Sequence, residues 1–146
     1  MTQQSDPALV HVSVYQRVFA AVSAGDEEAL GELLHPKLVD HNPIPAQRPG
    51  SEGFKQWMRA ARSSFPDLMA VVKDTVAEKD RVAGRVHYHG THGGDFLGVG
   101  PTGRVVNFEA FHIVRFEEGM IVEWWGTADL LGAIRQIGGR ILGPEE

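Results

Sequence analysis

The sequence predicts an α+β fold of cone shape, in which N-terminal helices pack on a curved antiparallel sheet that encloses a pocket. Apolar residues recur at helical spacing as far as Phe65, and strand-like runs begin at Leu68. Helices grouped before an antiparallel meander are typical of α+β domains, and such a sheet can bend around a helix. The 146 residues suffice for one core, so we expect a single domain over 1–146 with loose tails at 1–6 and 140–146.

Composition narrows the class of protein. Hydrophobic residues make up 42% of the chain, and the first residues lack the basic and apolar regions of a signal peptide. No apolar run approaches the roughly 20 residues that a membrane span needs. The net charge is −5 without a basic cluster, which argues against nucleic acid and membranes as partners. We therefore expect a cytoplasmic globular protein, and the absence of cysteine excludes disulfides and thiolate metal sites.

Two helices are expected first. Ser5 or Asp6 can cap the first helix, with Pro7 in its first turn, and an Ala-Gly pair ends it. Asp26 caps a second helix over residues 27–34, whose acidic first turn suits the helix macrodipole. The apolar face of the first helix is expected to contain Val10, Val14, Val18, Ala21 and Val22, widened by Tyr15 and Phe19.

A short extended segment over 38–43, a proline-rich loop and a third helix follow. Ser51 is expected to cap this helix, and Pro66 ends it. The helix carries an aromatic stripe that is either part of the core or the apolar wall of a ligand cavity. The stripe consists of Phe54, Trp57, Met58, Ala61 and Phe65.

Strands are expected over 68–77 and 81–90, joined by a polar turn. On the second strand, Arg85, His87 and His89 share one face. We find no alternation with apolar residues there, so this face is either solvated or lines something polar.

The histidines of this region invite comparison with a metal site. His87 and His89 can supply two ligands from a strand face, with His92 nearby in the glycine-rich segment 91–104. A catalytic zinc wants about three protein ligands, and the third would have to come from that loop. We therefore expect no metal, and we expect the loop to be a lid or a long turn.

A long hairpin dominates the last third of the chain, with strands over 105–116 and 120–129 on either side of a Glu-Glu-Gly turn. Alternation places Phe108, Ala110, His112, Val114 and Phe116 on one face, and Asn107, Glu109, Phe111, Ile113 and Arg115 on the other. The first set is apolar except for His112. Because an imidazole is costly to bury unless it is hydrogen-bonded, His112 is either a satisfied core histidine or a cavity residue.

Asp129 stands between the hairpin and a closing helix expected over 129–137. Its carboxylate can cap that helix. It can also transfer protons at a strand end, where a sheet opens into a pocket. The residues alone leave both interpretations open.

The order of elements and a set of short motifs resemble the SnoaL-like polyketide cyclase family, over roughly residues 10–138. That family has the cone-shaped fold shared with nuclear transport factor 2 and ketosteroid isomerase. The motifs are specific together rather than singly. They are Val39–Pro43, Phe65–Asp67, Asp80–Val82, Gly90–His92 with Gly94, Pro101–Arg104, Arg115–Gly119, Ile121–Trp124, Asp129 and Gln136–Gly138.

The resemblance implies a lyase- or isomerase-type enzyme of secondary metabolism that needs neither metal nor cofactor. Family cyclases close a ring by an intramolecular aldol step, with an aspartate at the end of the long hairpin as acid and base. Asp129 matches that aspartate, and His41, His92 and His112 are similarly placed to position or polarise the substrate. Trp124 stands where the family often has a histidine.

The expected substrate is a small hydrophobic or aromatic carbonyl compound, because the chain has enough aromatic residues for an apolar pocket. Such a pocket would raise the pKa of a carboxylate by desolvation and make it a better base. The residues expected to contact the substrate are Tyr15, Asn42, Trp57, Phe65, Arg85, Phe108 and Trp125.

Two other functions fit the same fold: a hydrolase or dehydratase using the same cavity, and a non-catalytic protein that binds a small ligand. We also expect a homodimer. The hairpin face opposite the pocket mixes polar residues with Phe111 and Ile113, and an uncovered face of this kind needs a partner.

Overall fold

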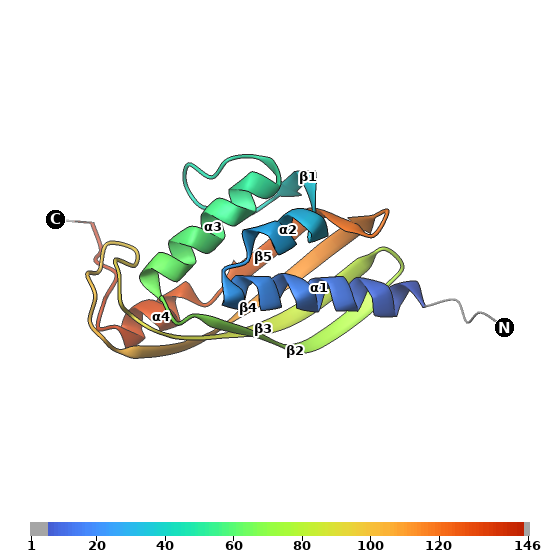
Figure 1. Ribbon diagram of the computed structural model, residues 1–146. Helices are drawn as coiled ribbons and strands as arrows, with labels where there is room; N and C mark the ends of the chain where they lie inside the picture. Colours follow the sequence, from blue (N-terminus) through green and yellow to red (C-terminus); the bar gives the residue numbers. More distant parts are fainter. Residues whose placement is uncertain (1–5, 145–146) are drawn as a thin grey trace.

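The computed structural model describes residues 6–144 and confirms the α+β class (Figure 1). Its strands form one sheet in the order β1-β5-β4-β3-β2. The elements are α1 (Pro7–Ala24), α2 (Glu27–Leu33), β1 (Leu34–Asp40), α3 (Gly50–Ser64), β2 (Met69–Glu78), β3 (Arg81–Thr91), β4 (Val105–Glu117), β5 (Met120–Ala128) and α4 (Leu130–Gln136). The expected tails fall partly on residues 1–5 and 145–146, which lie outside the described residues.

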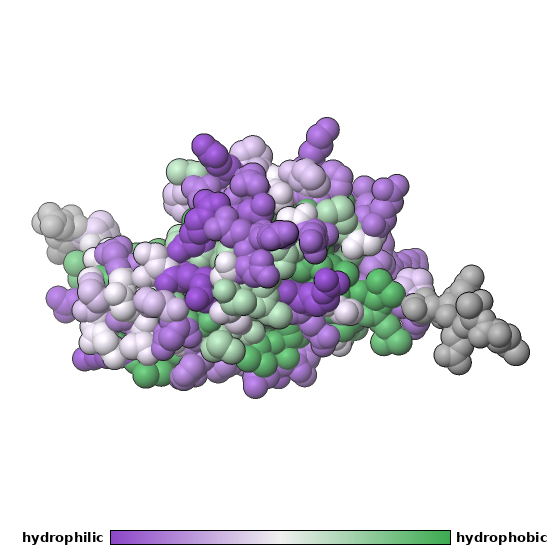
Figure 2. Space-filling view, viewed as in Figure 1, coloured by the Kyte–Doolittle hydropathy of each residue, from purple (hydrophilic) through white to green (hydrophobic). Residues whose placement is uncertain are grey.

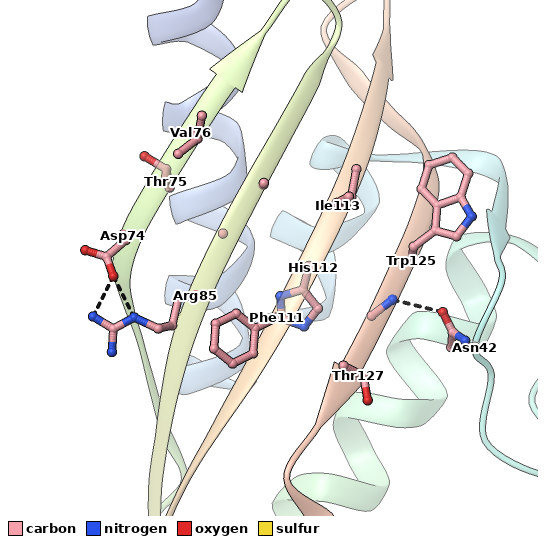
Figure 3. A pocket seen from close by; sticks show the side chains of 13 residues that line it. Asn42, Asp74, Thr75, Val76, Arg85, Phe111, His112, Ile113, Trp125 and Thr127 are labelled. Carbon is pink, nitrogen blue, oxygen red and sulfur yellow. Dashed lines mark hydrogen bonds and ion pairs between the residues drawn. The ribbon is translucent and has the colours of Figure 1, made fainter.

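The sheet is mixed rather than purely antiparallel. Strands β2 to β5 pair antiparallel, but β1 runs parallel to β5. The helices α1, α2 and α3 lie on one face of this sheet, which we call the inner face (Figure 1). Figure 3 looks at the opposite, outer face, with the helices behind the strands. No helix within residues 6–144 has the length and apolarity that a bilayer crossing requires.

The helix starts follow local side-chain chemistry. Asp6 caps α1 by accepting a hydrogen bond from the Ala8 N–H, and Asp26 caps α2 by accepting one from the Ala29 N–H. The expected Ser51 cap is wrong. Helix α3 begins at Gly50, whose φ of 77° and close approach to the Pro36 carbonyl require glycine.

The first strand begins earlier than expected. Helix α2 ends at Leu33, and Leu34 already pairs with Ile121 of β5. The residue before a proline avoids the helical region, so the segment around Pro36 becomes extended. A proline is tolerated there because β1 is an edge strand whose register is interrupted between Leu34 and Val39.

Strand β3 alternates more regularly than its sequence led us to expect. Its inward positions are all buried: Val82, Gly84, Val86, Tyr88 and Gly90. Two of these are glycines. Because glycine has no side chain, the alternation of apolar and polar residues along β3 could not be recognised in the sequence. The polar face with Arg85, His87 and His89 is therefore the solvent side of an ordinary half-buried strand.

The core lies between the helices and the inner face. Phe19 of α1 stands at its centre, with its ring 5.3 Å from that of His112 and 5.9 Å from that of Trp124. Figure 2 shows hydrophilic side chains over α3 on the helix side of the molecule. Hydrophobic ones gather near the start of α1, where Leu9 and Val10 are exposed.

Glycine at 84 leaves room for Tyr15. A Cβ at this position would lie 2.3 Å from the Tyr15 ring. We predict that Gly84→Ala lowers the free energy of unfolding by about 1–3 kcal/mol, because the core must shift to accept the methyl group.

Urea unfolding measures this loss. Gly100→Ala is the matched control, because a Cβ there meets nothing within 4 Å. Equal urea midpoints for the two variants would contradict the close packing of Tyr15 on β3.

Candidate functional site

A hydrogen bond between Tyr15 and His112 joins α1 to the inner face of β4. The Tyr15 Oη and His112 Nδ1 atoms are 2.8 Å apart. Tyr15 is fully buried and His112 is 9% exposed. The resulting site is a phenol–imidazole pair in the interior of the cone.

Two glycines on the neighbouring strands make room for this pair. Gly84 of β3 and Gly126 of β5 both stand opposite His112. A Cβ at 126 would lie 2.6 Å from the His112 ring and 3.1 Å from Trp124 Nε1. A side chain at either glycine would therefore occupy the space that Tyr15 and His112 use.

Burial keeps both members of the pair neutral at pH 7. It lowers the pKa of His112 from 6.5 to about 4 and raises the pKa of Tyr15 well above its ordinary value. Two tautomers are compatible with neutrality. If Tyr15 donates to Nδ1, His112 presents an Nε2–H donor; if Nδ1–H donates to Tyr15, Nε2 is an acceptor.

Aromatic rings extend from this pair along the inner face. Tyr88 of β3 stacks on Phe108 of β4 at 5.2 Å, and the Trp57 ring of α3 lies 6.4 Å from Tyr88. Phe65 is 6.4 Å from Phe108. Of the expected substrate contacts, Trp57, Phe65 and Phe108 thus share the inner side with Tyr15 and His112.

Tyr88 and Trp124 were not among the site residues expected from the sequence, although Trp124 was noted because it stands where the family often has a histidine. Trp124 is 4.9 Å from the His112 ring and is buried. The signal that could have found Tyr88 was the period of β3, which places it inward with Val86. Trp124 is likewise the inward member of the Trp124–Trp125 pair.

His92 is fully buried, but in the 91–104 segment and with both ring nitrogens engaged. Nε2 lies 3.1 Å from the Val99 carbonyl, which can only accept, so Nε2 carries the hydrogen. Nδ1 then accepts from the Thr102 N–H at 3.2 Å and hydroxyl at 2.9 Å. These hydrogen bonds show that His92 stabilises the 91–104 segment. It does not contribute to the Tyr15–His112 pair.

His41, Asn42 and Trp125 lie on the other side of the sheet from His112. The His41 ring is exposed, stacks on Trp125 at 4.5 Å and binds Glu123 at 2.9 Å. Asn42 accepts from the Gly126 N–H at 3.0 Å. We expected these residues to reach an interior pocket. Strand alternation turns Trp124 inward instead, and Trp125 therefore faces outward with His41.

Arg85 also belongs to the outer face. It forms ion pairs with Asp74 and with Glu109, the latter at 2.7 Å. Figure 3 shows the pairing with Asp74 at the rim of a hollow of about 620 Å³ that Phe111 and Trp125 also line. The His112 ring lies behind β4 in the same view.

His87 and His89 are hydrogen-bonded to another outer-face residue. Both bind the Asn107 side-chain oxygen, at 3.0 and 2.9 Å. Within residues 6–144, no group of three or more His, Cys, Asp or Glu side chains is placed to hold a metal ion.

Asp129 caps α4 by accepting a hydrogen bond from the Gly132 N–H at 2.9 Å. Its side chain is exposed, so the apolar surrounding that was expected for this carboxylate is not present. Asp129 also borders a second hollow of about 570 Å³, together with Phe108, Glu109 and His87. Most of the lining of this hollow belongs to the outer face of the sheet, with His87, Asn107, Glu109, Phe111 and Thr127.

The depressed pKa of His112 predicts a pH dependence of stability. Between pH 6.5 and about 4 the unfolded chain binds a proton at this imidazole and the folded chain does not. Stability should therefore fall by about 3 kcal/mol as the pH drops through this window, at about 1.4 kcal/mol per pKa unit.

Urea unfolding of wild type and His112→Gln at a series of pH values isolates this contribution, because glutamine does not titrate. The wild type should lose more stability than the variant between neutral pH and pH 4. Parallel curves would contradict the burial of a neutral imidazole.

Comparison with known proteins identifies the family. The model of the family described as SnoaL-like polyketide cyclase matches residues 12–137. Aklanonic acid methyl ester cyclase AcmA of Streptomyces galilaeus is 24% identical over 129 residues, covering 87% of this chain and 90% of that protein. DnrD of Streptomyces peucetius, a cyclase of the same name, is 26% identical over 135 residues, with 87% and 90% covered.

Solved structures agree with this assignment. TsrD from Streptomyces laurentii superposes with a TM-score of 0.85 at 30% identity, covering 94% of this chain and 100% of that one. Wild-type IdmH from Streptomyces antibioticus has a TM-score of 0.79 at 33% identity, with 88% and 98% covered. The chain therefore belongs to the SnoaL-like polyketide cyclase family.

Proposed function

We propose that this protein catalyses acid–base chemistry, an aldol ring closure or an enolisation, on a small hydrophobic carbonyl compound held between the helices and the inner face. No metal or cofactor takes part in the proposed reaction. The observation that carries the proposal is the buried neutral pair of Tyr15 and His112, at 2.8 Å in an aromatic surrounding.

Such a pair suits the charge that develops in the reaction. Removal of a proton next to a carbonyl group forms an enolate, whose oxygen becomes negative in the transition state. A preorganised neutral donor in a medium of low dielectric stabilises that oxygen without having to reorganise. In either tautomer, the pair of Tyr15 and His112 has one hydrogen left to donate, from Nε2 or from the phenol.

Asp129 is the proposed base. It matches the aspartate that the family resemblance assigns to proton transfer, and it borders the same hollow as Phe108. Phe108 also stacks on Tyr88 of the inner face, and it is the residue that this hollow shares with the inner aromatic rings. Asp129 must leave the Gly132 N–H, or share it, while it takes the proton.

The names of the relatives suggest the substrate class. They are cyclases of aklanonic acid methyl ester and nogalonic acid methyl ester. We propose an aromatic, polyketide-derived ester or ketone for this chain as well, because Trp57, Phe65 and Phe108 offer flat apolar surfaces to such a molecule.

A non-catalytic binding role is the second candidate. The observation that favours it is the exposed position of Asp129, whose carboxylate is already used as a helix cap. In that case the aromatic surface binds a ligand and Asp129 only supports α4.

Asp129→Asn tests the proposed function. With aklanonic acid methyl ester and a panel of aromatic β-keto esters, the variant should be slower than wild type by about two to four orders of magnitude. Its thermal unfolding should change little, because asparagine is a good N-cap. Tyr15→Phe should also lower the rate, since it removes the hydroxyl that holds His112.

Asp6→Asn is the matched control, because it changes the cap of α1 in the same way. It should leave turnover unchanged. Full activity in Asp129→Asn would remove Asp129 from the mechanism, and no turnover by the wild type across the panel would favour the binding role.

We also propose that the protein is a homodimer joined through the outer face of the sheet. Phe111 is 52% exposed and Val76 is 73% exposed on this face, with Ile113 beside them. Exposed apolar side chains grouped on one sheet face are typical of an interface.

Sedimentation at micromolar concentration should therefore give the mass of a dimer, and Ile113→Glu should shift it to a monomer. Leu9→Glu on α1 is the control, because Leu9 is also exposed but lies on the helix side. A wild-type monomer at about ten micromolar, where a stable dimer should remain associated, would contradict the interface.

A further inference from the structure

Tyr88 is a buried tyrosine whose hydroxyl is not used by the protein. Its side chain is 4% exposed and packs among Phe19, Trp57 and Phe108 on the inner face. Buried hydroxyl groups are nearly always hydrogen-bonded. Among the described residues, the Tyr15 hydroxyl has His112 as its partner, whereas the Tyr88 hydroxyl has none.

The Tyr88 hydroxyl does not lack a partner because neighbouring atoms seal it off. Across residues 6–144, His11 Nδ1 is the only fully enclosed side-chain nitrogen or oxygen without a hydrogen bond. The Tyr88 hydroxyl oxygen is therefore not fully enclosed by neighbouring atoms. It lies on the inner side of the sheet, where the Tyr88 side chain points.

Two further polar atoms of this kind belong to the neighbouring strands. Within the described part of the chain, His112 Nε2 on β4 and Trp124 Nε1 on β5 also have no protein partner and are not enclosed. Their rings are 4.9 Å apart. Each of the adjacent strands β3, β4 and β5 thus carries on its inner face one polar atom without a protein partner. The Phe19 ring packs against all three side-chain rings.

The two tyrosine hydroxyl groups lie near each other and share the same buried surroundings. Burial raises the pKa of Tyr88, and the nearby Tyr15 raises it further. Both tyrosines therefore remain protonated at neutral pH, which makes Tyr88 a hydrogen-bond donor throughout the range in which the enzyme would work.

We infer that the Tyr88 hydroxyl donates a hydrogen bond to a second oxygen of the substrate, whose reacting carbonyl is held at the Tyr15–His112 pair. The inference rests on the proposed function and sharpens its substrate class to hydrophobic aromatic compounds with at least two oxygen functions. Tyr88 lies on β3 and His112 on β4, and the Phe19 ring packs against both, so the two oxygens belong to different parts of the ligand.

Three probes of similar shape test the assignment: naphthalene, 2-naphthol and 2,6-dihydroxynaphthalene, with binding measured by equilibrium dialysis. The wild type should bind the dihydroxy compound more tightly than 2-naphthol. Tyr88→Phe should remove this advantage, about three- to tenfold in Kd, because it deletes one hydrogen bond. Naphthalene should bind both proteins alike, which shows that the aromatic surface is intact.

The outcomes separate this inference from the proposed function. If the probes bind but Tyr88→Phe leaves the affinity for the dihydroxy compound unchanged, the Tyr88 assignment is wrong and the proposed function stands. A hydroxyl that binds only water would give this result. If the wild type binds none of the probes, the inner site itself is refuted, and both proposals with it.

Discussion

The buried hydrogen bond between Tyr15 and His112 is the constraint on which the rest of the interior depends. A phenol and an imidazole are costly to bury without hydrogen bonds, and these two satisfy each other. Their bond fixes the position of α1 against β4. It also requires glycine opposite His112 on both neighbouring strands, since a methyl group at 84 or 126 would occupy the same space.

The two faces of the sheet have different physical characters. The inner face is aromatic and its titratable groups are held neutral by burial. The outer face carries charged pairs such as Arg85 with Asp74 and Arg115 with Glu123, interleaved with exposed apolar side chains. The inner face is therefore a medium of low dielectric, and the outer face exposes apolar side chains next to charged ones.

Histidines that looked equivalent in the sequence have different roles. His92 has both nitrogens engaged by its own loop, and His41 lies on Trp125 next to Glu123. Of these three, His112 alone keeps a nitrogen without a protein partner on the inner face, as far as residues 6–144 show. Residue type did not distinguish these imidazoles; the partners that the fold brings to each of them did.

The sequence by itself determined the fold class, the helix cap at Asp26 and the inward face of β4, because these depend on local periodicity and capping. It left the cap of α1 open between Ser5 and Asp6, and it indicated the family through the resemblance of short motifs along the chain. Only the tertiary structure decided the parallel pairing of β1 and the outward position of Trp125. It also decided that Tyr15 meets His112 across 97 residues of sequence separation, and that Tyr88 faces the same interior. These features depend on strand register and helix docking, which bring together residues that no local pattern connects.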